Sequence, residues 1–394
     1  MCVLSRFNVK CGVVGCGVIA NDEYIPAIRR YGILKAVCDI REDRARRTAR
    51  VWDVEEHYTS LSEMLERANL DSVFVLTGMG VHAKQVVEAA RAGKHVLVQK
   101  PLATSMDGLR EAVGAVRKAG VKVLVEPNVH MNPLYRRAGE LLSKAGEPYW
   151  FRAGFGRSPP IWGRETFFTK GAGGPLFDLG VYEVSILTLL LGPVRRVAGM
   201  ARISVPEVEL IDEGYLTEHL REVKTRSIWS VIAEAPRVGR ARVEAEDNVV
   251  ALLEMRQGAL GVLVSNYITP RQIRRPSRVE VYCSRGGLDV GGGSDYQDPV
   301  LTAVYLEDDE PKRVAVSGRE LGLVEWDGRY SWNYYEASTR HFLECIAEDR
   351  DPIPGLDWGA HVSEVLIRAL ESARRGRALE VGSTFEPYAR PGAY

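Results

Sequence analysis

The sequence predicts a doubly wound parallel α/β domain over residues 1–127, followed by an α+β domain with a largely antiparallel open sheet over residues 128–394. Three observations support this prediction. Apolar strand-like runs alternate with helical patterns as far as residue 126. After Pro127, strands rich in glycine, arginine and aromatic residues follow one another beside glycine turns. At 394 residues the chain is too long for one ordinary core, so two domains are expected.

The composition narrows the class of protein. The chain has 52 basic and 52 acidic residues and therefore no formal net charge, which argues against binding to nucleic acid or a membrane surface. No apolar run is long enough to span a membrane, and the N-terminus lacks the pattern of a signal peptide. The six cysteines form no C-x-x-C pair and no metal-ligand spacing. We therefore expect a cytoplasmic protein with no metal ion, nucleic-acid partner or membrane contact.

The first element is a β-branched apolar run over residues 9–14, which predicts a buried strand ending in a glycine turn. The turn and the start of the next helix are Gly15-Cys16-Gly17-Val18-Ile19-Ala20, which fits G-x-G-x-x-A. The first glycine permits the tight turn, the second lets a pyrophosphate approach, and the small third residue lets the helix pack closely. A helix predicted over residues 18–30 would point its N-terminal N–H groups at the phosphates.

A second strand, residues 33–38, ends at Asp39 at the spacing expected for an acid that bonds the adenosine ribose. Ile40 and Arg41 follow it and are assigned to the same edge of the cofactor. Strand, turn, helix, strand and acid together predict a Rossmann domain that binds NAD. Asp39 would repel the 2′-phosphate of NADP, although Arg41 and Arg44 soften this preference and leave NADP as the alternative.

The remaining elements of the first domain alternate regularly. They are helix 41–51, a short strand near 57–58, helix 61–68, strand 71–76, helix 81–91, strand 94–99, helix 106–118 and strand 121–125. Ligands of such sheets bind at the carboxyl ends of the strands. Thr77, Gln99, Lys100 and Glu126 all fall at such ends.

The second domain begins with a predicted helix over residues 133–144. Strands are expected at 249–254, 260–265 and 278–283, and helices at 175–191, 334–347 and 359–374. Residues 207–226 are acidic first and basic afterwards with helical spacing, which we interpret as a solvated surface insertion; a lid over the site is the alternative. Residues 383–394 are expected to form a loose tail.

The helix that opens at Pro175 is apolar on nearly every face, yet it carries Asp178 and Tyr182 one turn apart. Residues at i and i+4 share a helix face, so this carboxylate and this phenol are neighbours. Buried polar groups require partners. The pair is either a structural hydrogen bond in a core or a catalytic pair.

Three separated motifs of this chain resemble those of the Gfo/Idh/MocA family of nicotinamide-dependent oxidoreductases. They are Gly15-x-Gly17-x-x-Ala20, Gln99-Lys100-Pro101 against the family's Glu-Lys-Pro, and Gly173-Gly174…Asp178-x-Gly180-x-Tyr182. The resemblance covers nearly the whole chain except residues 207–238. It implies catalytic roles for Lys100 and Asp178, places Tyr182 where many members carry histidine, and implies a cis Lys100–Pro101 bond. It also implies an oligomer formed through the open sheet, a homodimer or a homotetramer.

Some positions depart from the family pattern. Gln99 replaces the glutamate of the motif and removes one negative charge near the nicotinamide ribose, although an amide still bonds hydroxyls. His82 keeps a motif histidine and is assigned to the cofactor edge. His130 stands where many members carry arginine. With Asp178, it is expected to line the substrate together with Trp162 and Arg164, which precede the glycine motif.

These observations predict hydride transfer between NAD(H) and a secondary alcohol or ketone of a sugar, polyol or cyclic diol. Tyr182 would transfer the hydroxyl proton, and Lys100 would be the cation that lowers the pKa of the phenol. Lys100 as the proton-transfer group is the alternative. Two other functions stay open: a non-catalytic dinucleotide-sensing regulator, and tight cofactor retention with hydride exchange between sugars.

Overall fold

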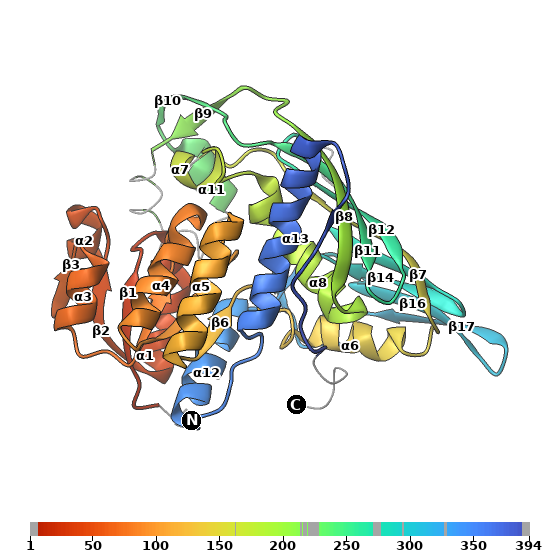
Figure 1. Cartoon of the computed structure of the whole chain (residues 1–394), viewed down its shortest axis with the longest axis horizontal. Helices are drawn as coiled ribbons and strands as arrows, with labels where there is room; N and C mark the ends of the chain where they lie inside the picture. Colours follow the sequence, from red (N-terminus) through yellow and green to blue (C-terminus); the bar gives the residue numbers. More distant parts are fainter. Residues whose placement is uncertain are drawn as a thin grey trace.

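The computed structural model describes residues 7–161, 163–212, 215, 219, 228–270, 277–293, 295–326 and 329–387. Figure 1 shows the parallel sheet of the first domain at one side, the large sheet of the second domain at the other, and helices α8 and α13 between them. No helix in these ranges is long and apolar enough to cross a membrane.

The first domain contains a six-stranded parallel sheet in the order β3-β2-β1-β4-β5-β6, which confirms the doubly wound prediction. Its strands are β1 Lys10–Val14, β2 Ile33–Cys38, β3 Glu56–Tyr58, β4 Ser72–Val75, β5 His95–Val98 and β6 Val123–Val125. Strand order reverses between β1 and β4. A crevice for ligands forms outside the carboxyl ends at such a reversal.

Helices cover both faces of this sheet and agree with the expected ranges to within a few residues. They are α1 Ile25–Tyr31, α2 Glu42–Trp52, α3 Leu61–Arg67, α4 His82–Arg91 and α5 Met106–Ala119. The helix expected over residues 18–30 is divided, because a π-helical turn, η1 Ala20–Tyr24, precedes α1. Pro26 has no N–H to donate into the preceding turn, so the regular α pattern is not continuous there.

The second domain is built on a nine-stranded sheet in the order β17-β16-β14-β13-β7-β12-β11-β8-β20. All neighbours are antiparallel except β12 and β7. The strands are β7 Pro148–Gly156, β8 Val194–Arg202, β11 Asn248–Met255, β12 Leu260–Asn266, β13 Arg278–Cys283, β14 Gly286–Gly291, β16 Leu301–Glu307, β17 Glu310–Val316 and β20 Leu379–Glu380. A small separate sheet contains β15 Asp295–Tyr296, β18 Val324–Trp326 and β19 Arg329–Ser331.

One face of the nine-stranded sheet is covered by α6 Pro133–Leu142, α8 Val181–Leu191 and α13 Leu356–Arg375 (Figure 1). Trp358 of α13 is fully buried and donates its indole N–H to Thr188 of α8 at 3.2 Å. Large apolar side chains of alternate strand positions remain exposed: Trp150, Met200, Val250, Leu252, Leu260, Tyr282 and Val304. The sheet is therefore open on one face, as expected.

The first domain is completed by a helix from late in the chain. Helix α12 Tyr334–Ala347 packs on α1 and η1, and its Phe342 and Leu343 are fully buried in the core around β1. The rings of Phe342 and Phe74 meet edge to face with centroids 5.6 Å apart. The second domain is thus not one continuous stretch after residue 127, because α12 belongs by packing to the first.

Two expectations for loops and tails are corrected. Residues 207–211 are a strand rather than a helix, because β9 Glu207–Ile211 pairs with β10 Arg237–Arg242 and buries Val208 and Ile211. Helix α11 Ile228–Glu234 precedes β10. Most of residues 213–227 lie outside the described residues. Residues 383–387 do not form a loose tail, since Ser383 donates its N–H to Glu364 at 2.8 Å and Phe385 is buried; residues 388–394 lie outside the described ranges.

Candidate active site

The glycine turn after β1 leaves open space beside its backbone. Gly15 has a φ of +95°, and a Cβ there would lie 2.6 Å from the carbonyl oxygen of Leu76, so only glycine fits. A Cβ on Gly17 would meet no described atom within 4 Å. Ala20 is fully buried where the following helix packs on the sheet. The turn therefore passes close to the end of β4 at Gly15 and is unobstructed at Gly17, as close approach of a phosphate requires.

Asp39 is held across this turn from the end of β2. Its Oδ2 accepts the N–H of Cys16 at 2.8 Å, and its Oδ1 accepts the N–H of Arg41 at 2.9 Å. Each carboxylate oxygen can accept a second hydrogen bond, so capacity remains for ribose hydroxyls. Beside it, the side chain of Ile40 is 91% exposed, and the guanidinium of Arg41 pairs with Asp43 at 3.1 Å. An exposed apolar group beside a fixed carboxylate fits an adenosine.

Lys100 follows β5 and reaches the second domain. Its ammonium donates to Oδ1 of Asp178 at 2.7 Å and to the main-chain oxygen of Asp178 at 2.8 Å. Asp178 lies in a π-helical turn, η3 Leu176–Gly180, that leads into α8. The Lys100–Pro101 bond is cis, as the family resemblance implies. Burial alone would raise the pKa of Asp178, but the charge of Lys100 and its hydrogen bonds hold it below the ordinary value. Asp178 is therefore a carboxylate paired with an ammonium.

Tyr267 completes this pair and was missed by the sequence analysis. Its hydroxyl donates to Oδ2 of Asp178 at 2.8 Å from the position just after β12. Burial raises the pKa of this phenol well above its usual value, so it stays a donor. One pattern in the sequence could have indicated Tyr267. Residues two apart on a strand face the same side, and Ser265, two residues earlier, donates its hydroxyl to the carbonyl of Pro175 beside the same helix.

Tyr182 lies one turn after Asp178 and beside Lys100. The ammonium of Lys100 is 5.3 Å from the centre of the Tyr182 ring, and the side chain of Tyr182 is partly exposed. Burial, Tyr335 and the carboxylate of Asp178 raise the pKa of Tyr182 well above its usual value. The expectation of a lowered pKa for Tyr182 does not hold in the protein alone, because burial is the largest cause of the shift.

His82 and Thr77 have partners within the protein. The two ring nitrogens of His82 lie 2.9 Å from the carbonyl oxygen of Pro101 and 3.0 Å from that of Thr77, and the ring is 1% exposed. His82 thus joins the turns after β4 and β5. The cofactor contact expected for it stays a prediction. The hydroxyl of Thr77 donates to Oε1 of Gln85 at 2.5 Å and keeps its acceptor capacity.

The structure describes the side chains of only some of the residues expected to line the substrate. His130 is buried edge-on against Trp358, and burial together with His341 lowers its pKa to about 3. The ring is a neutral packing group at neutral pH, which does not support the substrate contact expected for it. Trp162 lies outside the described residues. Arg164 begins α7 Arg164–Phe167, but its side chain also lies outside them. Asp178 alone of these four has a described side chain at the Lys100 pair.

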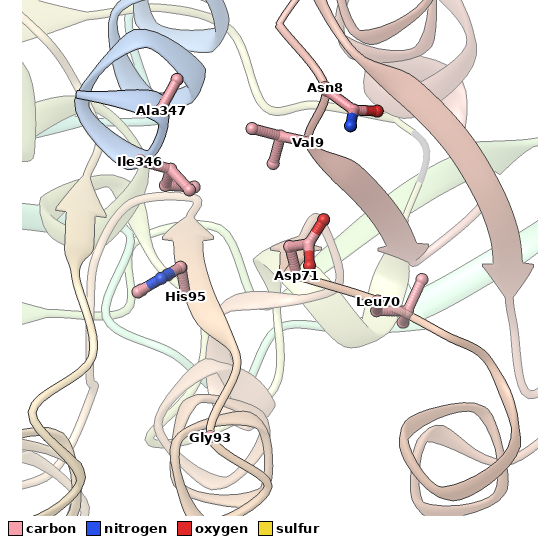
Figure 2. Close-up of a pocket in the computed structure, with 8 residues that line it drawn as sticks. All are labelled: Asn8, Val9, Leu70, Asp71, Gly93, His95, Ile346 and Ala347. Carbon is pink, nitrogen blue, oxygen red and sulfur yellow. The ribbon is translucent and has the colours of Figure 1, made fainter. Parts of the chain in front are cut away.

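A depression of about 470 Å³ lies at the opposite edge of the parallel sheet (Figure 2). It is lined by residues that precede or begin β1, β4 and β5 and by the end of α12. Two of its polar groups have partners: Asp71 accepts the N–H of Lys10 at 2.7 Å, and His95 accepts that of Lys122 at 3.0 Å. This edge is the amino end of the strands, so the depression is separate from the Lys100 pair.

Comparison with known proteins agrees with this geometry. Residues 9–127 match the model of an oxidoreductase family with an NAD-binding Rossmann fold, and residues 135–289 match the GFO/IDH/MocA C-terminal domain. The chain is 29% identical over 386 residues to scyllo-inositol 2-dehydrogenase (NAD⁺) of Bacillus subtilis, covering 95% of this chain and 96% of that one. It is 23% identical over 384 residues to D-apiose dehydrogenase of Paraburkholderia graminis, covering 95% and 90%.

A solved structure shares the whole fold. The WlbA dehydrogenase of Bordetella pertussis, solved with NADH and UDP-GlcNAcA, superposes with a TM-score of 0.69 at 21% identity, covering 96% of this chain and 99% of that one. At this identity the likeness concerns the fold.

Proposed function

The chain belongs to the Gfo/Idh/MocA family of oxidoreductases with an NAD-binding Rossmann fold, and from that premise we propose that it oxidises a secondary alcohol of a sugar or polyol, or reduces the corresponding ketone. One observation carries the proposal: Lys100 from the first domain and Asp178 and Tyr182 from the second converge at the carboxyl edge of the sheet. The cofactor is assigned to the same edge by the open turn at Gly17 and the exposed Ile40.

NAD(H), when bound, accepts or supplies the hydride, so the protein's residues must bind the substrate oxygen and move its proton. Tyr182 has a phenol that stays protonated at neutral pH, and we assign to it the transfer of a proton to the oxygen of a ketone substrate. The ammonium of Lys100 favours negative charge that develops on that oxygen. Asp178 holds the ammonium in place, and Tyr267 in turn donates to Asp178.

The substrate class is supported by the named relatives. One is named for scyllo-inositol and the other for D-apiose, and both compounds carry several hydroxyl groups. The test is a panel of sugars, polyols and cyclic diols assayed by NADH absorbance, with NAD and NADP in parallel. Turnover of a polyhydroxylated compound supports the proposal. Tight NADH binding without turnover of any member would favour the dinucleotide-sensing regulator instead.

We also propose that the open sheet face pairs with a second copy of this chain. The exposed apolar positions Trp150, Leu252 and Leu260 lie on the strands next to the ion pair between Arg152 and Glu280 and on the following strand. A face that carries both signs of charge among apolar side chains can complement itself under twofold rotation. An exposed apolar face of this kind marks an interaction surface.

A further inference from the structure

A chain of three buried side chains links the ends of β6 and β5. The hydroxyl of Tyr24 donates to Oε1 of Glu126 at 3.0 Å, and Nε2 of Gln99 donates to the Tyr24 oxygen at 2.6 Å. Tyr24 is fully buried, and Glu126 and Gln99 are nearly so. Gln99 directly precedes Lys100, so this chain ends at the edge of the sheet that holds the candidate active site.

The direction of these hydrogen bonds is fixed from the Glu126 end. Burial raises the pKa of Glu126 from 4.5 to about 7, so above that pH the group is an ionised carboxylate and only accepts. Its Oε2 accepts the N–H of Asn128 at 2.8 Å. The single proton of Tyr24 therefore points to Oε1 of Glu126, and the Tyr24 oxygen must accept. Gln99 can satisfy that oxygen only with its NH₂ group. Its carbonyl oxygen Oε1 consequently points away from Tyr24, and no group in the described ranges donates to it.

We propose that Glu126, acting through Tyr24, orients the Gln99 amide so that its Oε1 accepts a hydrogen bond from a ribose hydroxyl of the bound cofactor. Glu126 and Tyr24 are then positioning residues for cofactor binding, and Gln99 makes the contact. The proposal rests on NAD binding by the proposed function and not on the identity of the substrate.

The same arrangement explains the glutamine in the Gln99-Lys100-Pro101 motif. A glutamate at position 99 is a pure acceptor. Gln99 matches that behaviour only if its NH₂ group is occupied, and Tyr24 occupies it. Glu126, at the end of β6, thus acts through Tyr24 on the amide at the end of β5.

The test exchanges the carboxylate and the amide between positions 126 and 99. The dissociation constant of NADH is measured at pH 8, above the pKa of Glu126, by fluorescence titration without substrate. The proteins are wild type, Glu126→Gln, Gln99→Glu and the double variant, with thermal unfolding of each cofactor-free protein. In Glu126→Gln the new amide donates to Tyr24, Tyr24 donates to Gln99, and the Gln99 amide turns over. In Gln99→Glu two carboxylates compete for one phenolic proton. Each single change should weaken NADH binding by about 3- to 10-fold.

The double variant should restore NADH binding to within about 3-fold of wild type, because a glutamine at 126 donates to Tyr24 and Tyr24 donates to a glutamate at 99. Two controls separate this from other causes. Gln85→Glu combined with Glu126→Gln restores the net charge but not the hydrogen bonds between positions 126, 24 and 99. This variant should not restore NADH binding. Tyr24→Phe removes the link, so that Glu126→Gln has no further effect in that background.

Additive effects of the two single changes would overturn the proposal, because they would show independent structural roles. Unchanged NADH binding in Glu126→Gln would also overturn it. A wild-type protein that binds no NADH would instead refute the proposed function. Absence of turnover with tested substrates would leave the NADH measurement and this proposal intact.

Discussion

The ammonium of Lys100 lies 2.7 Å from a carboxylate oxygen of Asp178, although the two residues come from different domains. A second hydrogen bond, to the main-chain oxygen of Asp178, ties the lysine to the π-helical turn itself. The charge of Lys100 is therefore placed by the second domain as much as by β5. Any change in how the domains meet alters the electrostatics of the reaction site.

Tyr182→Phe should lower kcat by about 10²- to 10⁴-fold, because it removes the proposed proton-transfer group. NADH affinity should be nearly unchanged, since only the phenolic oxygen is lost. Steady-state kinetics and fluorescence titration measure the two quantities. Should Tyr182→Phe retain nearly full kcat while Lys100→Met is inactive, Lys100 is the proton-transfer group.

Tyr267→Phe should reduce both stability and kcat, since it leaves Oδ2 of Asp178 without its donor. A hydrogen bond to a charged group contributes about 1.5–3 kcal/mol, so the free energy of unfolding should fall by about that amount. Denaturant unfolding and kcat are the measurements. Tyr282→Phe is the matched control, because its hydroxyl donates to Glu280 at 3.1 Å on the exposed sheet face; an equal effect of both changes would contradict the role of Tyr267.

The cofactor preference should be NAD over NADP by about tenfold, or about 1.4 kcal/mol. Asp39 is fixed by two backbone N–H groups and cannot turn away from a 2′-phosphate, while Arg41 is paired with Asp43. The measurement is kcat/KM for both cofactors. Asp39→Ser should remove most of the difference, and equal values in the wild type would refute the assignment.

Glu183→Gln should stabilise the protein at pH 8 and leave it unchanged at pH 4. Glu183 is fully buried, accepts from Ser277 at 2.5 Å, and has no described partner at Oε2. Burial raises its pKa from 4.5 to about 7. The folded protein therefore holds a proton that the unfolded chain releases between these pH values, so stability falls as pH rises through that window, by up to about 3 kcal/mol.

Glu364→Gln provides the control, because its effect on stability at high pH should have the opposite sign. Burial alone would raise the pKa of Glu364, but hydrogen bonds from Ser383 and Gly382 lower it overall. Glu364→Gln should therefore destabilise the protein at pH 8, and its effect should shrink as the pH falls below the ordinary range of a carboxyl. Unfolding at several pH values measures both variants, and equal signs would contradict these assignments.

Leu252→Glu should convert the proposed oligomer to monomers, because it places a charge on the open sheet face. Light scattering at micromolar concentration measures the change. Val51→Glu, an exposed apolar position of α2, is the control and should leave the mass unchanged. A monomeric wild type would refute the second-copy proposal.

The predictable parts of the site are those encoded locally. Gly15 and Asp39 are marked by strands, a turn and a spacing of about twenty residues, and these short-range patterns define the Rossmann opening. Asp178 and Tyr182 are marked by helical spacing. Tyr267 reaches Asp178 from 89 residues away, and Tyr24 reaches Glu126 from 102 residues away. No periodicity links such positions, because their contact depends on how separate elements pack. The strand over residues 207–211 was missed for the same reason, since its partner is β10.

The packing of α12 on the first domain has a consequence for synthesis on the ribosome. Glu336 accepts a hydrogen bond from Tyr31, 305 residues earlier, and Phe342 fills the core beside Phe74. Because chains emerge N-terminus first, the parallel sheet lacks its covering helix α12 until most of the second domain has been translated. Nascent chains should become protease-resistant in the first domain only once α12 has left the exit tunnel. A fragment that stops at residue 127 should aggregate, because the surface that α12 covers remains exposed.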